Sequence, residues 1–248
     1  MIEKSWKLAG LMSRGDSRWL GALRYGVAAG VEHVRALKSL GEMGTVVDIG
    51  ANRGQFALAA RHCFPGARIV SFEPLPGPAE KFRRVLAGDS RLVLHQVAIG
   101  PARGEETIHI SAADDSSSLL PITGMQRSLF PGTGEVGTAV VQVAPLSEFL
   151  PAEEIEPPAL LKLDVQGYEL EALKGCEALL SRFSTVYAEC SFAELYEGQA
   201  LTDEVIAWLR DRGFRLSGVY HMSYDGKGRA IQADFLFTRT AVYGVSLD

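Results

Sequence analysis

The sequence predicts an α/β fold: a mostly parallel β-sheet with one antiparallel strand at its end, preceded by a helical N-terminal segment. Short β-branched runs alternate with helical segments from residue 45 onward, which is typical of parallel strands joined by covering helices. The last two predicted strands, by contrast, are joined by a loop too short for a crossover. These two strands must therefore run antiparallel.

The predicted elements follow one another at short spacing. Apolar residues recur at helical spacing over 18–40, where Gly26 and Gly30 indicate either a kink or a break into two helices. Two extra strands, 107–110 and 139–143, flank a loop rich in Ser, Gly and Pro. The main strands are predicted at 45–49, 68–72, 91–97, 159–165, 185–190, 214–221 and 232–238, and the helices between them at 55–63, 78–86, 169–180 and 203–211.

Composition excludes several classes of protein. Of the 248 residues, 47% are hydrophobic and 22% charged, which is enough apolar material for a core and excludes a disordered chain. A net charge of -5 argues against nucleic acid as a partner. The three cysteines form no CxxC pair, and no stretch approaches the roughly 20 apolar residues that span a bilayer. The N-terminus lacks a secretory apolar core, so we expect a cytoplasmic protein.

The most informative segment is the turn after the first strand. It carries Gly50 and Gly54 before a helix begins, and glycines there allow a sharp turn and close approach of a ligand. Glu73 and Pro74 end the next strand about twenty positions later, where an acid can accept hydrogen bonds from both hydroxyls of a ribose. Because Asn52 stands where a dinucleotide motif has its second glycine, the turn favours an adenosine cofactor with an amino acid moiety over one with a pyrophosphate.

Asp48, inside the same strand, has two interpretations. It could meet the ammonium of such a cofactor, directly or through water, or it could be a buried aspartate that caps a tight turn. The sequence leaves both open.

Three separated blocks of the chain resemble the FkbM family of S-adenosylmethionine-dependent methyltransferases. The first is VDIGANRGQF at 47–56, followed by FEP at 72–74. The second is LKLDVQGYE at 161–169, followed by LKG at 173–175, and the third is QADFLF at 232–237. The family often has Glu where this chain has Gln166, a departure that removes one charge near the site.

The resemblance implies a class I methyltransferase fold, a Rossmann-like sheet of seven strands in the order 3-2-1-4-5-7-6. It implies S-adenosylmethionine as the cofactor and methyl transfer to oxygen, on a small hydroxylated acceptor such as a sugar, a glycolipid or a polyketide-like natural product. At the positions that match the family's motif, the resemblance implies that Gly50, Asn52 and Gly54 line the methionine end of the cofactor. It also implies that Glu73 holds the ribose. Ala98 lies beside adenine, and Ser116 and Ser117 reach the adenosine or close the pocket.

Four ionisable groups are predicted to converge on the rim where parallel strands end: Asp164, Glu189, His221 and Asp234. Asp164 would orient the acceptor hydroxyl, take its proton or hold a metal, and its alternative role is to cap the helix that begins near residue 169. His221 is a second candidate base, with a structural role as its alternative. Glu189 and Asp234 could join Asp164 around Mg²⁺, or the acids could instead pair with Lys162 or arginines.

The N-terminal segment, residues 1–44, precedes a methyltransferase domain of residues 45–248. Trp6, Trp19 and Tyr25 could pack on the core or cover the acceptor, so the segment is either a lid or the contact face of a homodimer. Tyr168 and Tyr187 are expected in the core. Two other functions stay open: a non-catalytic scaffold that binds the cofactor, and a nicotinamide-dependent oxidoreductase, which the missing second glycine disfavours.

Overall fold

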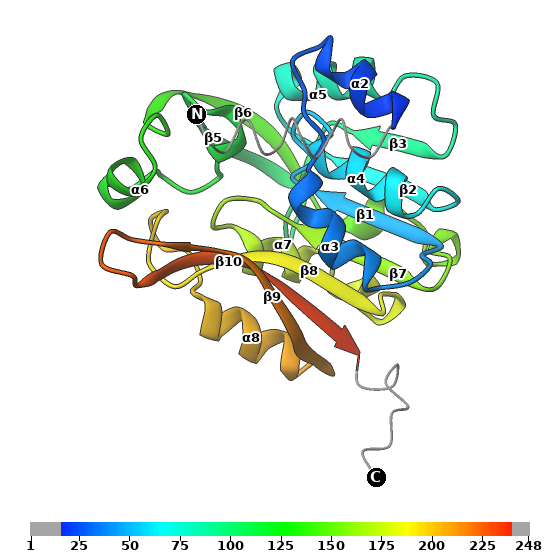
Figure 1. Cartoon of the computed structure of the whole chain (residues 1–248). Helices are drawn as coiled ribbons and strands as arrows, with labels where there is room; N and C mark the ends of the chain where they lie inside the picture. Colours follow the sequence, from blue (N-terminus) through cyan, green and yellow to red (C-terminus); the bar gives the residue numbers. More distant parts are fainter. Residues whose placement is uncertain (1–15, 240–248) are drawn as a thin grey trace.

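A seven-stranded sheet forms the centre of the computed structural model, which describes residues 16–239 (Figure 1). Its strand order is β3-β2-β1-β7-β8-β10-β9, and β10 is antiparallel to both of its neighbours. In chain order this is 3-2-1-4-5-7-6, so the predicted topology is confirmed. The strands are β1 (Thr45–Ile49), β2 (Arg68–Phe72), β3 (Leu92–His95), β7 (Ala159–Leu163), β8 (Thr185–Ser191), β9 (Phe214–Tyr224) and β10 (Ala230–Arg239).

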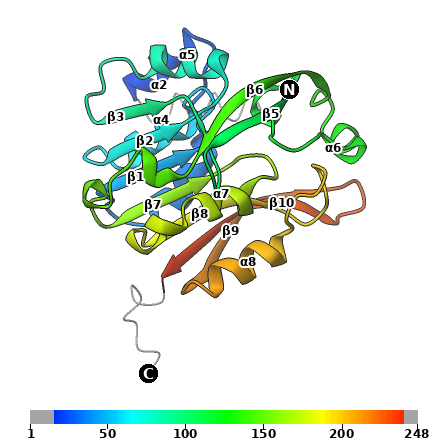
Figure 2. The same ribbon diagram turned by 180° about the vertical axis from the view of Figure 1, so that it is seen from behind.

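Helices cover both faces of this sheet. Figure 1 shows α3 on the near face, and Figure 2 shows α7 on the other. The first face is buried by α2 (Ser17–Leu23), α3 (Val34–Lys38), α4 (Gln55–Cys63) and α5 (Pro76–Val85). The second is buried by α7 (Glu169–Gly175), the 3-10 helix η5 (Glu177–Arg182) and α8 (Thr202–Arg210). The predicted helix 169–180 is therefore two shorter elements.

A second, smaller sheet stands to one side of the large one in both views (Figures 1 and 2). Its order is β4-β6-β5, with β4 (Ala98–Ile99), β5 (Gly104–Ser111) and β6 (Glu135–Ala144). The 3-10 helix η2 (Asp114–Ser116) and α6 (Gly124–Leu129) lie between β5 and β6. The two extra strands are confirmed, but the third main strand is shorter than predicted: it ends at His95, and residues 98–99 pair with β6 instead.

The N-terminal segment folds back on the sheet as several short pieces. The predicted helix is broken after α2, where Gly26 has a φ of +71°, and resumes as the 3-10 helix η1 (Val31–His33) and α3. Trp19 is fully buried and its indole N–H donates to the carbonyl of Leu58 at 3.2 Å, whereas Tyr25 is 51% exposed. Trp6 lies outside the described residues. Within residues 16–239, no helix combines the length and apolar character needed to cross a bilayer.

Candidate active site

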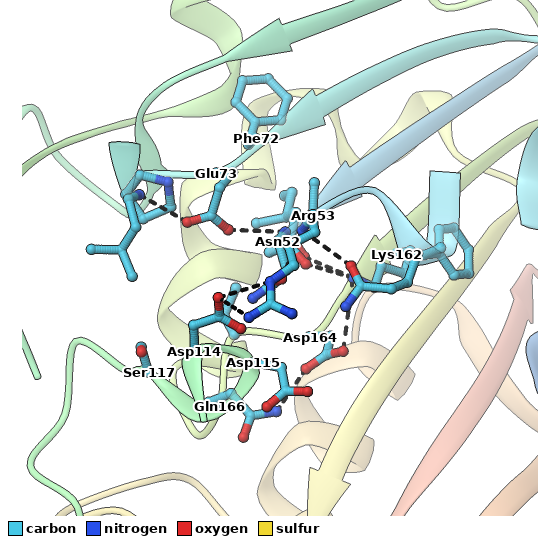
Figure 3. Close-up of a pocket in the computed structure, with 18 of the residues that line it drawn as sticks. Asn52, Arg53, Phe72, Glu73, Asp114, Asp115, Ser117, Lys162, Asp164 and Gln166 are labelled. Carbon is cyan, nitrogen blue, oxygen red and sulfur yellow. Dashed lines mark hydrogen bonds and ion pairs between the residues drawn. The ribbon is translucent and has the colours of Figure 1, made fainter. Parts of the chain in front are cut away.

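A cavity of about 810 Å³ opens at the carboxyl ends of β1, β2 and β7. Its wall combines the turn after β1, the end of β2, the η2 loop, the end of β7 and residues 23–33 of the N-terminal segment. Figure 3 shows four carboxylates, those of Glu73, Asp114, Asp115 and Asp164, gathered around Asn52, Arg53 and Lys162. A cavity with this excess of acids suits a ligand that carries positive charge.

The turn after β1 brings the chain unusually close to the end of β7. A Cβ atom on Gly50 would lie 1.9 Å from the backbone carbonyl oxygen of Asp164, and the φ of Gly50 is +77°, so only glycine fits there. Gly54, which was expected to line the cofactor, is not among the described residues that line the cavity. A Cβ on Gly54 would meet Leu86 and Phe82 of the α5 region, so this glycine serves helix packing instead.

Glu73 ties the turn to the end of β2. Its Oε2 accepts the backbone N–H of Asn52 at 2.9 Å, and its Oε1 accepts that of Leu75 at 2.8 Å. Only 5% of Glu73 is exposed, and this burial raises the pKa of its carboxyl to about 7. Because a carboxylate offers about four acceptor positions, two remain for ligand hydroxyls.

Apolar residues line the side of the cavity where the family resemblance places adenine. Pro74, Val97, Ala98 and Ile99 all line it, and Ser117 does so with its Oγ accepting the N–H of Ser111. Ser116 does not fit its expected role. Its carbonyl oxygen accepts a hydrogen bond from the hydroxyl of Tyr196 at 3.1 Å. Ser116 is not among the residues of 16–239 that line the cavity.

Arg53 spans from the glycine turn to the η2 loop. Its Nε donates to Asp114 Oδ2 at 2.8 Å, and both residues line the cavity (Figure 3). This contact joins the two sides of the opening near the expected position of the cofactor.

Asp48 meets an ammonium, but it is that of Lys162 and not of a ligand. The Lys162 Nζ lies 2.9 Å from Asp48 Oδ1, and Asp48 is fully buried below the cavity floor. The prediction that Asp48 contacts the cofactor is therefore wrong. Burial alone would lower the pKa of the Lys162 ammonium, but the carboxylates of Asp48 and Asp164 hold it above its usual value. Lys162 Nζ also donates to the Gly50 carbonyl at 2.9 Å, which fixes the glycine turn.

Asp164 lines the cavity with 37% of its side chain exposed. Gln166, with a left-handed φ of +55°, donates from Nε2 to Asp164 Oδ1 and to Glu189 Oε2, both at 2.8 Å. The proposed capping role of Asp164 is wrong, because α7 has Tyr168 as its N-cap and Glu169 accepts the loop N–H groups of Val165 and Gly167.

The hydrogen bonds of Glu189 do not fit the predicted role of metal ligand or catalyst. Its second oxygen, Oε1, accepts the amide of Gln232 at 3.0 Å, so both oxygens are occupied by neutral donors. Burial and then the charges of Asp164 and Asp234 raise its pKa well above the usual value. Asp234 Oδ2 receives the hydroxyl of Tyr187 at 2.9 Å. These donors leave no place for Mg²⁺ between Asp164, Glu189 and Asp234, and the set does not fit that ion.

His221 does not end a strand, as was predicted, but lies within β9. A register shift between β9 and β10 gives it a φ of +47° and swings its ring toward Asp234, whose Oδ2 lies 2.7 Å from His221 Nδ1. Within residues 16–239 neither residue lines the cavity. His221 and Asp234 are therefore not placed to touch an acceptor.

Sequence reasoning missed three residues of the site. Lys162 was considered only as a partner for acids, although a lysine inside a fully buried strand is itself a signal of a buried ion pair. Arg53 stood unremarked in the glycine turn. His33 gave no signal, because its meeting with β8 and β10 follows from the tertiary structure alone.

Comparison with known proteins gives a consistent set of matches. A model of the Methyltransferase FkbM domain matches residues 48–216. The 2-O-methyltransferase NoeI of Sinorhizobium fredii is 29% identical over 160 residues, 62% of this chain and 66% of that protein, so the match spans just under two thirds of its length. The 31-O-demethyl-FK506 methyltransferase FkbM of Streptomyces tacrolimicus is 31% identical over 194 residues, 68% of this chain and 72% of that protein. Among solved structures, the magnesium protoporphyrin IX methyltransferase of Synechocystis aligns over 85% of this chain and 81% of that chain, with 12% identity and a TM-score of 0.45.

Proposed function

The chain belongs to the FkbM family of S-adenosylmethionine-dependent methyltransferases, and we propose that it methylates a hydroxyl oxygen of a small acceptor. A sugar, a glycolipid or a polyketide-like molecule would be such an acceptor. The 2-O-methyltransferase among its relatives supports an oxygen as the methylated atom. The family match sets aside the nicotinamide-dependent oxidoreductase.

One observation supports the cofactor site above all others: the buried Glu73 carboxylate at the end of β2. Two backbone N–H groups hold it in place, and two acceptor positions remain for the hydroxyls of a ribose. The apolar wall at Val97 and Ile99 suits adenine, and Asp164 supplies negative charge at the end of β7 for the positive end of the cofactor. The residues present therefore fit S-adenosylmethionine, which supplies the methyl group when bound.

The N-terminal segment acts as a lid in this proposal. Residues 23–33 form one wall of the cavity, and Trp19 anchors the segment on α4. Exclusion of water strengthens electrostatic interactions in such a site. The boundary at residue 44 between the segment and the domain belongs to the same proposal. A homodimer also stays a prediction, which size-exclusion chromatography with light scattering checks.

Calorimetry with S-adenosylhomocysteine and with NAD tests the cofactor assignment. We expect S-adenosylhomocysteine to bind and NAD not to bind, and the reverse result would overturn the proposal. A panel of hydroxylated probes, including monosaccharides, flavonoids and macrolactones, is then incubated with S-adenosylmethionine and scored for a mass gain of one methyl group. Cofactor binding without methylation of any probe would favour the non-catalytic scaffold.

A further inference from the structure

His33 is a titratable residue in the cavity wall to which the proposed function gives no role. It ends η1 in the N-terminal segment and is one of the lining residues, with 16% of its side chain exposed. Three rings make edge contacts with its ring: Phe56 at 5.4 Å, Tyr187 at 5.7 Å and His221 at 5.4 Å between ring centroids. The imidazole is thus fixed in one orientation at the cavity wall.

The neighbours of His33 determine which ring nitrogen carries the proton. Nδ1 lies 3.2 Å from the Tyr187 hydroxyl oxygen and 3.4 Å from Asp234 Oδ2. Tyr187 already donates its only proton to Asp234, so both atoms that face Nδ1 are acceptors. Nδ1 must therefore be the protonated nitrogen, and in the neutral ring the lone pair is on Nε2.

Asp234 is held as a carboxylate in this arrangement. Burial alone would raise its pKa, but hydrogen bonds from His221 and His33 hold the pKa well below its usual range. The hydrogen bond to Asp234 in turn raises the pKa of the His221 imidazole. The left-handed backbone at His221 thus serves to aim a third donor at Asp234.

Nε2 is the ring nitrogen left for a ligand. Neither Tyr187 nor Asp234 lines the cavity, and within the described part of the chain Nε2 has no hydrogen-bond partner. We propose that His33 is the general base of methyl transfer, with Asp234 fixing its tautomer and His221 and Tyr187 as positioning residues. This inference rests on the proposed function, because it requires a hydroxyl acceptor.

The step balances without a further reactant. The acceptor oxygen forms a bond to the methyl carbon while the carbon–sulfur bond breaks, its electron pair going to sulfur. The acceptor O–H bond breaks as well, and its proton moves to Nε2 of His33. The imidazolium that forms is stabilised by the Asp234 carboxylate behind it.

Nuclear magnetic resonance tests the tautomer without an acceptor. Long-range proton–nitrogen spectra of the full-length, isotope-labelled protein with S-adenosylhomocysteine distinguish the two neutral forms of His33, assigned by the signal that His33→Gln loses. We expect Nδ1–H in the wild type and in Tyr187→Phe, where Asp234 still accepts. Asp234→Leu, which has no acceptor, frees the Tyr187 hydroxyl to donate to Nδ1 and should shift the ring toward Nε2–H. His109→Gln, on β5, should change neither the tautomer nor cofactor binding.

The outcomes separate the inference from the function on which it rests. Absence of S-adenosylhomocysteine binding contradicts the proposed function. Normal binding with Nε2–H on His33 in the wild type, or with no change in Asp234→Leu, overturns the base assignment alone. With any probe that the wild type methylates, His33→Gln should lower turnover by about 10²–10⁴-fold while S-adenosylhomocysteine affinity changes less than about twofold. Full turnover in that variant would also overturn the assignment.

Discussion

The raised pKa of Glu73 should make cofactor binding depend on pH near neutrality. Burial raises this pKa to about 7, against the opposing effect of the N–H groups of Leu75 and Asn52. Only the ionised carboxylate can accept all of its donors, two from the backbone and two from the ribose. We therefore expect S-adenosylhomocysteine to bind more tightly as the pH rises through 7.

The magnitude follows from the ionised fraction. With a pKa of about 7, this fraction is about one tenth at pH ~6 and about nine tenths at pH ~8. If only the ionised form binds, the apparent Kd varies inversely with the fraction. Affinity should then be about tenfold higher at pH ~8, a difference of about 1.4 kcal/mol.

Calorimetric titration with S-adenosylhomocysteine across this pH range measures the effect. Glu73→Gln is the matched control, because it keeps the shape of the side chain but cannot ionise. Ionisation of the ligand affects binding to both proteins equally. The difference between their pH profiles therefore reports the ionisation of Glu73 alone. We expect the variant to bind about tenfold more weakly at pH ~8 and with a flatter profile. A wild-type Kd that stays constant, or an equal slope in the variant, would refute the reasoning.

Three further substitutions test other parts of the site. Asp164→Asn should weaken S-adenosylmethionine binding about ten- to hundredfold by calorimetry, with a melting temperature close to that of the wild type because Asp164 caps no helix. Lys162→Met leaves the fully buried Asp48 unpaired and should cost about 3–5 kcal/mol, a fall of about 6–20 °C in melting temperature. The double variant with Asp48→Asn should recover most of that loss, and no recovery would argue against the ion pair. Gly50→Ala should lower both stability and S-adenosylhomocysteine affinity, since its Cβ would clash with the chain at 1.9 Å, whereas Gly77→Ala has open space within α5 and should lower neither.

Local patterns were enough to predict the first strand–helix–strand unit of the sheet to the residue. The ranges of β1, α4 and β2 agree with expectation because each strand is a short β-branched run and glycine or proline marks each boundary. The end of β9 was missed for a physical reason. The register shift at His221 adds a left-handed residue inside a continuous strand, and no pattern of hydrophobic residues reveals such a bulge.

The site likewise contains some contacts that the sequence predicts and others that it does not. Gly50, Asn52 and Glu73 belong to the consecutive β1–α4–β2 unit, whose two strands are neighbours in the sheet, and their arrangement follows from that unit. The contact of His33 with Asp234 joins an N-terminal 3-10 helix to the last strand, so only the completed packing brings them together. Gln166 was noted as a lost charge, whereas the structure shows an amide that joins two carboxylates.

Because β10 lies between β8 and β9, the sheet cannot be completed in the order in which its strands are synthesised. β9 leaves the ribosome before β10, yet β10 lies between β8 and β9 in the sheet. Until β10 inserts, β8 presents an open edge of unpaired N–H and C=O groups, and β9 has no neighbour in the sheet. Open edges of this kind are templates for pairing with other chains. A nascent or truncated chain that stops before β10 therefore has two defects at once: an edge that invites aggregation, and a His33 without the carboxylate that faces it.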